Sequence, residues 1–347
     1  MTHIRNSGMI ILSNCLTDTA DEGCRKVACS LIGRIKKAEP KTTVVTYESG
    51  QGLGDLHLKM NKLMLSGKLF RLLRRKKEPL LYVPAPAKMR AAALRIFILS
   101  RFARWGLKVI LVMAFPVDRL SGFLLRKSDA RVITLSRDAW EHYRQAIGNQ
   151  AEYLKTGVDT AKFRPVDSGQ KEALRKKYGI PPGKLVALHV GHLKRERNVE
   201  SLLKLDEKWH SVLAVSTLTA AEQNEDLRKR LEASGKVTLI DWYLPNVEEL
   251  YQLADVYLFP VVQNHKCIDV PLSALEAAAC GIPVVSTPFG ELRQLLDKPG
   301  FYEIESFEPA QLNERMAMAA SDSTDPRQSV LEYDWENAVQ QALIIYN

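Results

Sequence analysis

One stretch of nineteen residues is the most informative part of the sequence: Asp269-Val270-Pro271-Leu272-Ser273-Ala274-Leu275-Glu276-Ala277-Ala278-Ala279-Cys280-Gly281-Ile282-Pro283-Val284-Val285-Ser286-Thr287. Pro271 is typical of the first turn of a helix, where its missing N–H is no loss. The helix is predicted to run to Cys280 and to end at Gly281, and Pro283 opens a strand. The free N–H groups at the helix start favour a phosphate group. Glu276 follows one turn later, where its carboxylate can accept hydrogen bonds from sugar hydroxyls. An ordinary buried helix-to-strand crossover, with Glu276 on a solvated face, is the other interpretation of this spacing.

Apolar, β-rich runs alternate with helical patterns along the whole chain, which predicts parallel sheets with crossover helices. The predicted strands are residues 9–12, 42–47, 80–83, 108–113, 131–135, 185–190, 211–215, 237–240, 256–260 and 282–286. The predicted helices are residues 25–37, 58–77, 88–105, 137–146, 199–205, 220–233, 247–254, 272–279 and, with Asp334 as N-cap, 335–346. The fold class is therefore α/β, with two doubly wound sheets on either side of a linker at 157–183. Two such sheets form a cleft, and ligands bind them at the carboxyl ends of their strands.

Length and composition limit the class of protein. The 347 residues suit two domains, and 46% hydrophobic with 26% charged residues is typical of a globular chain rather than a disordered one. Apolar runs stop near nine residues, short of the roughly 20 that span a bilayer. The N-terminus has no signal-peptide pattern, and the five cysteines form no CxxC pair, so we expect reduced thiols in a cytoplasmic protein.

The positive charge is concentrated in the first half of the chain. Residues 1–165 hold 30 Lys and Arg against 13 Asp and Glu, whereas the remainder holds 19 against 27. Residues 59–104 hold 13 basic residues and one acidic residue, Glu78. Phospholipid, nucleic acid and a phosphorylated substrate are all candidate partners for such a basic half.

Basic residues interleaved with Leu, Phe and Trp on the helices predicted at 58–77 and 88–105 fit binding to an anionic membrane surface. The alternative is that the apolar side is core and the bases form a solvated face. The excess of 13 to 1 favours membrane contact, at the inner face of the membrane. Nucleic acid is not expected, because no zinc, helix-turn-helix or aromatic-interleaved signature accompanies the charge.

The 269–287 stretch resembles the donor-site signature of the retaining glycosyltransferases of family 4, which have the GT-B fold. Their signature reads Glu-x7-Glu followed by Ala-x-Ala-Cys-Gly-x-Pro-Val-Val. The resemblance implies that Glu276 holds the nucleotide ribose and that the backbone of Leu272, Ser273 and Ala274 faces the diphosphate. The first Glu of the family falls on Ile268 here. The nearest carboxylate is Asp269, one residue closer to Glu276, and we expect it to contact the donor sugar instead.

A second segment, Val186 to Val199, resembles the family's strand and loop Val-Gly-Arg-Leu-x-x-x-Lys-Gly. Gly191 permits close backbone approach, and cations beyond a strand's carboxyl end would neutralise a leaving diphosphate. Arg197 falls on the family's Lys. His192 falls on its Arg, and Arg195 is placed to compensate for the lost charge. A solvated basic loop is the other interpretation of this segment.

Four shorter segments follow the family's order: 156–165, the interdomain segment; 241–245, the loop at the nucleotide base, with Tyr243; 255–260, a strand; and 288–291, a turn. An aromatic residue such as Tyr243 is as often core as ligand contact. The resemblance implies an acceptor-binding domain at 1–165, a nucleotide-sugar domain at 166–328, and a helix at 329–347 that crosses back to the first domain.

The acceptor side has weaker signals. The loop Asn14 to Gly23 lies where the family places a Gly-rich acceptor loop, and we single out Asp21 and Gly23 in it. His57 and His142 are candidates for an acceptor-side histidine, although a lone histidine is more often structural. With no Asp-x-Asp motif and no His/Cys cluster, no metal and no cofactor are expected, since the nucleotide sugar is a substrate.

The sequence thus predicts a retaining glycosyltransferase that moves a sugar from a UDP- or GDP-sugar to a hydroxyl acceptor, such as a lipid-linked or cell-surface glycan precursor. Its predicted catalytic residues are Asp269, Arg197 and Glu276. Two alternatives stay open. One is a non-catalytic nucleotide-sugar or lipid-binding module of the same fold. The other, a dinucleotide-dependent oxidoreductase, is disfavoured because no G-x-G-x-x-G follows the first strand.

Overall fold

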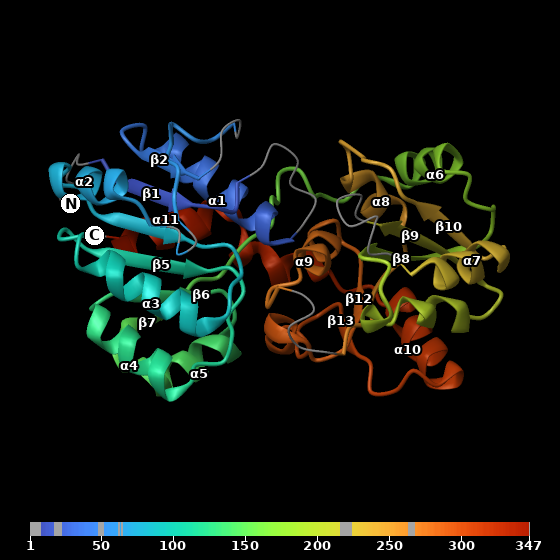
Figure 1. The fold of residues 1–347 in the computed structure, drawn as a ribbon. Coiled ribbons are helices and arrows are strands. Elements are labelled where there is room, and N and C mark those ends of the chain that lie inside the picture. The colour runs from blue at the N-terminus through green and yellow to red at the C-terminus, as the bar shows by residue number, and fades with distance from the viewer. Residues whose placement is uncertain are drawn as a thin grey trace. The chain divides into compact units, whose positions relative to one another are not determined.

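The computed structural model describes residues 8–16, 23–47, 52–61, 63, 65–215, 224–262 and 268–346, with the side chains of the last three outside this description. The chain divides into two units. Unit 1 consists of residues 1–156 and 335–347, and unit 2 consists of residues 157–334. Each unit is a parallel sheet with helices packed on it (Figure 1).

The sheet of unit 1 has seven strands in the order β3-β2-β1-β4-β5-β6-β7, and every pairing is parallel. The strands are β1 (Ile10–Ser13), β2 (Thr43–Thr46), β3 (Leu56–His57), β4 (Leu80–Val83), β5 (Leu107–Leu111), β6 (Arg131–Thr134) and β7 (Ala151–Tyr153). The helices are α1 (Gly23–Ala38), α2 (Gly67–Arg75), α3 (Met89–Ser100), α4 (Arg119–Ser128), α5 (Arg137–Ile147) and α11 (Trp335–Tyr346). Buried side chains of α2 to α5 form one core cluster with the sheet, and α1 packs against α11.

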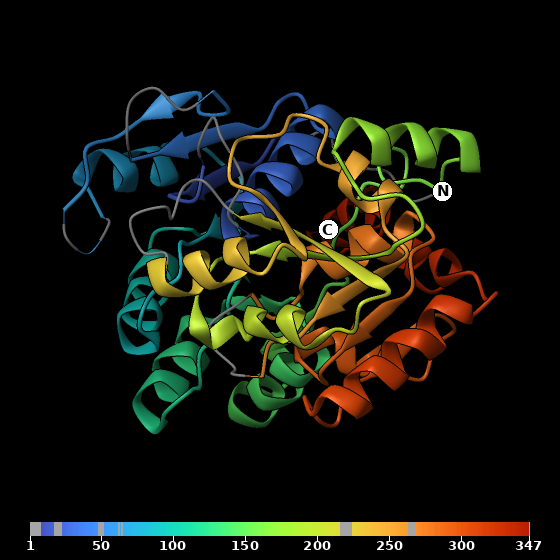
Figure 2. The ribbon, with the colours of Figure 1, turned by 90° about the vertical axis from the view of Figure 1, so that its right-hand side faces the viewer.

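The sheet of unit 2 has six parallel strands in the order β10-β9-β8-β11-β12-β13. The strands are β8 (Leu185–Gly191), β9 (Trp209–Val215), β10 (Val237–Ile240), β11 (Val256–Phe259), β12 (Val284–Ser286) and β13 (Phe301–Glu303). The α-helices are α6 (Ser168–Lys177), α7 (Glu225–Ala233), α8 (Glu248–Leu253), α9 (Leu272–Ala279) and α10 (Pro309–Ser321). Helices α7 and α10 pack on one face of the sheet, and α8 and α9 on the other (Figure 2). The predicted fold class, two doubly wound parallel sheets, is confirmed.

The helix predicted at 58–77 is shorter than expected. Only α2, Gly67–Arg75, is helical, because Ser66 caps it by accepting a hydrogen bond from the Leu69 N–H at 3.2 Å. The Asn61 side chain accepts hydrogen bonds from the N–H groups of Leu63 and Leu65, at 2.9 and 3.1 Å, which holds that segment in a turn. The helix predicted at 199–205 is a 3₁₀ helix, Val199–Lys204.

The unit boundary lies after Thr156, before the predicted boundary at 165. The segment after Gly157 belongs to unit 2 because that unit supplies its hydrogen bonds. The Val158 N–H donates to the Tyr333 carbonyl at 2.9 Å, and the Arg327 guanidinium donates to the carbonyls of Thr160 and Phe163. The predicted linker 157–183 also contains α6, which begins where Asp167 accepts a hydrogen bond from the Gln170 N–H at 2.8 Å.

The C-terminal helix returns to unit 1, as the sequence predicted. Its bounds, Trp335–Tyr346, are those predicted for the helix itself, whereas residues 329–334 of the predicted crossover segment 329–347 belong to unit 2. The Arg34 guanidinium of α1 lies over the Trp335 ring at 5.8 Å. The second piece of unit 1 thus follows the whole of unit 2 in the chain.

Candidate active site

Strands β8 and β11 separate at their carboxyl ends, and this split defines the candidate site of unit 2. Their pairing covers only Ala187 with Val256 and Leu188 with Tyr257. Beyond these two residue pairs, a side chain and not the backbone bridges the strands, since the Tyr257 hydroxyl lies 3.3 Å from the Val190 carbonyl. The chain turns to opposite sides of the sheet from these two strands, and ligands bind doubly wound sheets at such a point.

His189 lies between the two separating strands and is not among the site residues predicted from the sequence. Its Nδ1 lies 2.8 Å from the Leu258 carbonyl, so Nδ1 carries the proton, while Nε2 is buried with no hydrogen-bond partner among the described residues. Burial lowers the pKa of His189 to about 4, and the charge of Arg197 and the neighbouring His192 lower it further, against the bond to Leu258. A side chain on Gly191 would place its Cβ 2.9 Å from Nε2, which explains the glycine.

Arg197 ends the 3₁₀ helix Arg195–Arg197 (η2) beyond β8, and its side chain is turned inward. The residue is 8% exposed, and no hydrogen bond or ion pair joins its guanidinium to another of the described residues. The next residue, Asn198, has the left-handed φ of 53° that turns the chain away. A buried charge without a counter-ion is costly, so an anionic ligand would stabilise this arrangement.

The other predicted cations of this loop are less enclosed. Arg195 is exposed, and His192 and Gly191 are half-buried at the end of β8. Of the two arginines predicted for this site, only Arg197 has a buried side chain.

Helix α9 begins with backbone N–H groups that no side chain caps. Pro271 is its N-cap and provides no side-chain hydrogen bond, and the N–H groups of Leu272 and Ser273 have no acceptor among the described residues. Ser273 is the only half-buried residue of α9, since Leu272, Ala274 and all later residues of the helix are buried. Because β8 and β11 are parallel, their carboxyl ends bring Arg197 and this helix start to the same edge of the sheet.

Glu276 lies one turn into α9 and is 3% exposed. Its Oε2 accepts a hydrogen bond of 2.7 Å from the hydroxyl of Tyr251, on α8. Burial and the charge of Glu276 raise the pKa of Tyr251 well above its usual value, so the phenol stays a donor. The alternative that Glu276 lies on a solvated face is wrong.

Asp269, which precedes α9, is half-buried, and its backbone is fixed by the turn at 288–291. Its carbonyl accepts a hydrogen bond from the Glu291 N–H at 2.8 Å. Gly290 has φ of 50°, and a Cβ there would lie 2.1 Å from the Asp269 carbonyl oxygen. Only glycine permits this contact.

Tyr243 follows β10 at the same edge, and its side chain is exposed, as is that of Trp242. The alternative that Tyr243 belongs to the core is therefore wrong. Of the residues predicted for the acceptor loop, Asp21 lies outside the described residues, and Gly23 is the first residue of α1. Of the candidate histidines, His57 Nδ1 lies 2.7 Å from the Thr46 hydroxyl, and His142 Nε2 accepts the Val117 N–H at 3.0 Å.

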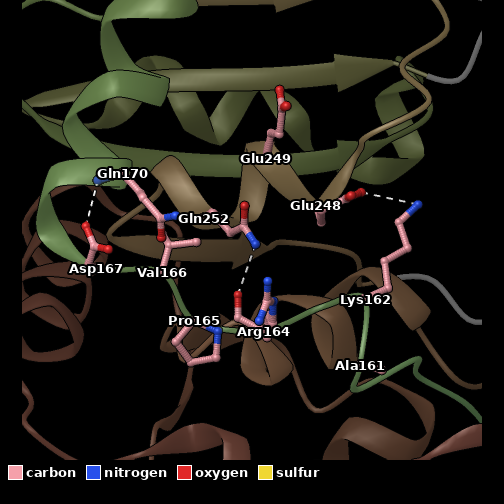
Figure 3. A pocket seen from close by; sticks show the side chains of 10 residues that line it. All are labelled: Ala161, Lys162, Arg164, Pro165, Val166, Asp167, Gln170, Glu248, Glu249 and Gln252. Carbon is pink, nitrogen blue, oxygen red and sulfur yellow. Dashed lines mark hydrogen bonds and ion pairs between the residues drawn. The ribbon is translucent and has the colours of Figure 1, made fainter.

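Unit 2 also holds a polar cavity of about 560 Å³ that none of the predicted residues lines (Figure 3). Among its lining residues are Lys162, Arg164, Asp167, Glu248, Glu249 and Gln252. Its carboxylates are engaged within the unit: Glu248 lies 3.2 Å from Lys162 Nζ, Glu249 accepts a bond of 2.6 Å from Tyr178, and Asp167 caps α6. We therefore assign no ligand to this cavity.

A cluster of metal ligands and a membrane-spanning helix are both absent from the described ranges. No three His, Cys, Asp or Glu side chains lie together there as metal ligands. No helix in the described part of the chain is both long enough and apolar enough to cross a bilayer.

Comparison with solved structures gives the fold type. The structure resembles that of HepE from Anabaena in complex with UDP and glucose with a TM-score of 0.73, covering 97% of this chain and 98% of that one at 14% sequence identity. The predicted GT-B fold is thereby confirmed.

Sequence comparison then gives a family match for part of the chain. Residues 184–322, within unit 2, match the model of the glycosyl transferases group 1, so the predicted family resemblance is confirmed for this unit. A D-inositol 3-phosphate glycosyltransferase of Segniliparus rotundus is 28% identical over 192 residues, 51% of this chain and 41% of that protein. A lipopolysaccharide core biosynthesis mannosyltransferase, LpsB of Rhizobium meliloti, is 24% identical over 187 residues, 51% of this chain and 50% of that protein. The chain spans about half the length, or less, of these curated relatives.

Proposed function

We propose that this chain is a retaining glycosyltransferase that moves a sugar from a nucleotide diphosphate sugar to a hydroxyl acceptor. Two features at the same edge of the sheet carry the proposal. Arg197 is buried without a counter-ion, and the start of α9 has no side-chain cap. A diphosphate would supply the missing negative charge and accept hydrogen bonds from the N–H groups of Leu272 and Ser273.

In the proposed transfer, the bond between the anomeric carbon and the β-phosphate oxygen breaks, and a bond from that carbon to the acceptor oxygen forms. The acceptor proton passes to the leaving phosphate. Arg197 and the α9 amides stabilise the charge that develops on the diphosphate, with Arg195 in support. Glu276, oriented by Tyr251, binds the ribose hydroxyls, and Asp269 contacts the donor sugar.

The names of similar proteins support this choice of donor and acceptor. The HepE structure contains UDP and glucose, and the two curated relatives are named for transfer to an inositol phosphate and for lipopolysaccharide core synthesis. For this chain we propose a UDP- or GDP-sugar donor and a lipid-linked or cell-surface glycan precursor as acceptor, with the nucleobase packed beside Tyr243. Because protein cations and amides face the diphosphate, we propose that no metal is required, and that EDTA leaves transfer unchanged.

The test is binding of UDP, GDP and UMP to the full chain, measured by calorimetry and by thermal unfolding. A ligand at 100 times its dissociation constant stabilises a protein by about 2.7 kcal/mol, which is readily detected. Arg197→Gln is expected to weaken binding of the diphosphate at least about tenfold and of the monophosphate much less. The matched control is Arg315→Gln, an arginine of α10 for which binding should not change.

A non-catalytic nucleotide-sugar module is favoured by one observation, since Ile268 stands where the family has its first Glu. Labelled nucleotide sugars offered with a lipid extract separate the two functions. Transfer or hydrolysis that falls in Glu276→Ala and Arg197→Gln supports the enzyme. Binding without any turnover supports the module, and no binding of any nucleotide diphosphate contradicts both.

A further inference from the structure

Unit 1 displays large apolar side chains at its surface, next to arginines and lysines. Leu120 and Phe123, one turn apart on α4, are 53% and 51% exposed. Leu94 of α3 is 37% exposed, and Trp105, in the turn after α3, is 55% exposed. Single exposed apolar residues are ordinary, but a group of them on neighbouring elements marks an interaction surface.

Contacts at both ends show that α3 and α4 lie side by side (Figure 1). Near their starts, Arg90 Nε lies 2.5 Å from the carboxylate of Asp118, the N-cap of α4. Near their ends, Arg101 donates a hydrogen bond of 2.9 Å to the Lys127 carbonyl. The exposed Leu94, Leu120 and Phe123 therefore belong to one layer of two adjacent helices.

The charge around this layer is mostly positive, although the exposed Asp129 stands at the end of α4. Residues 66–128 contain fifteen Lys and Arg and two carboxylates, Glu78 and Asp118. Both carboxylates are already paired, Glu78 with Lys76 at 3.4 Å and Asp118 with Arg90. The exposed bases Arg104, Arg119 and Lys127 have no acidic side chain within ion-pair distance in the described ranges, so a positive field surrounds the apolar residues.

The core and the helix dipole explain only part of this arrangement. The inner faces of α2 and α3 do form core, through residues such as Leu69, Leu73, Ile96 and Leu99. Arg126 and Lys127 also suit the last turn of α4, where cations interact favourably with the helix dipole. Neither effect explains why Leu120 and Phe123 face outward between Arg119 and Lys127 on the same helix.

We propose that this surface, made of Leu94, Trp105, Leu120 and Phe123 with Arg104, Arg119 and Lys127, docks on an anionic lipid bilayer. The apolar side chains would enter the headgroup boundary, and the bases would lie against acidic headgroups. The positive charge favours an anionic membrane over a neutral one, because a neutral membrane would leave these bases without negative partners. The proposal includes α4, which lies beyond the basic region 59–104 in the sequence, and it is independent of the proposed sugar transfer.

The experiment is cosedimentation of the full chain with vesicles of equimolar phosphatidylglycerol and phosphatidylcholine, and with vesicles of phosphatidylcholine alone. We expect binding to the mixed vesicles, weakened by salt, and at least about tenfold weaker binding to the neutral ones. Equal binding to both, or none to the mixed vesicles, overturns the proposal.

Two variants divide the surface into its parts. Leu120→Ser with Phe123→Ser removes exposed apolar area, and Arg104→Gln with Arg119→Gln and Lys127→Gln removes three charges. Each charge near an acidic surface contributes about fivefold to affinity, so the triple variant should bind on the order of 100-fold more weakly. The controls are Met318→Ser and Lys176→Gln, an exposed methionine and an exposed lysine of unit 2, which should bind as the parent does.

The outcomes are distinguishable from simple unfolding, because every substituted side chain is exposed and thermal unfolding should be unchanged. Weaker binding of both variants supports the proposal. If the triple variant loses binding while the double serine variant keeps it, the surface is a purely electrostatic site, such as one for nucleic acid, and the membrane proposal is overturned. Failure of nucleotide binding in the calorimetric test leaves this result unaffected.

Discussion

The Tyr251 hydroxyl donates a hydrogen bond of 2.7 Å to Oε2 of Glu276, and both side chains are buried. The bond joins two helices, α8 and α9, that cover the same face of the second sheet. It orients the carboxylate for which the family resemblance implies ribose binding, so Tyr251 is a positioning residue in the proposed site.

Tyr251→Phe should lower both stability and nucleotide affinity. A hydrogen bond to a charged group contributes about 1.5–3 kcal/mol, and its loss leaves a buried carboxylate with one donor fewer. We expect the free energy of unfolding in urea to fall by about 2 kcal/mol and the affinity for UDP, measured by calorimetry, to fall several-fold.

Tyr333→Phe is the matched control, because the Tyr333 hydroxyl donates to Glu291 at the same distance, 2.7 Å, in an equally buried pair. It should lose similar stability and keep its affinity for UDP. If both variants weaken nucleotide binding equally, Tyr251 has a general structural role and does not position Glu276 for a ligand.

Local signals in the sequence explain why some elements were predicted with their observed bounds. Pro271 before α9 and Gly281 after it, with φ of 78°, fix both ends of that helix. The short strands β3, β7 and β13 were not predicted, because two or three residues carry no periodicity. Their place in the sheets depends on neighbouring strands rather than on their own sequence.

In the candidate site, too, the residues predicted from the sequence are those with a local motif, and the residues missed are those that depend on distant partners. The segments around Arg197 and Glu276 were predicted from a motif that is continuous in sequence. His189 and Tyr251 were not, since each has the pattern of a core residue in a strand or helix. Their roles depend on partners in other elements, Leu258 at 69 residues' separation and Glu276 at 25. A histidine within the apolar run Leu185 to Val190 was the one available signal.

Gly290→Ala should be more destabilising than an ordinary glycine substitution. The new Cβ would lie 2.1 Å from the Asp269 carbonyl oxygen, at φ of 50°, so the backbone before α9 must shift. We expect a loss of about 3 kcal/mol or more in the free energy of unfolding.

Gly179→Ala separates backbone conformation from steric contact. Gly179 has φ of 68° with nothing within 4 Å of an added Cβ, so this variant should lose only about 1 kcal/mol. Thermal and urea unfolding of the two variants give the comparison. Equal losses would show that the contact between Gly290 and Asp269 is not close in solution.

His189 predicts a loss of stability in mild acid. The pKa of its imidazole is about 4 in the folded protein, chiefly because of burial, against 6.5 for an exposed histidine. Between these values the unfolded chain binds the extra proton more tightly, so stability is complete above about pH 6.5 and falls as the pH approaches 4. The loss attributable to this residue is about 3 kcal/mol.

His189→Phe removes this titration and suits a site where the rings of Tyr257 and Phe259 lie about 6 Å away. Urea unfolding of both proteins between pH 4.5 and pH 7.5 should show a shallower pH dependence in the variant, at the cost of the bond to Leu258. Parallel pH profiles would mean that His189 is accessible to protons in the folded state.

Arg197→Met tests whether the arginine binds an anionic ligand or stabilises the fold. Because no described residue pairs with the guanidinium, removing its charge relieves an uncompensated burial. Without nucleotide, the free energy of unfolding should be unchanged or rise by about 1 kcal/mol, whereas stabilisation by added UDP should largely disappear. Since Arg197 lowers the pKa of His189, the variant should also lose less stability in mild acid, and its loss should level off at a higher pH. A loss of several kcal/mol in the variant without ligand would instead show that Arg197 stabilises the fold itself, and the anion-site assignment would then lose its main support.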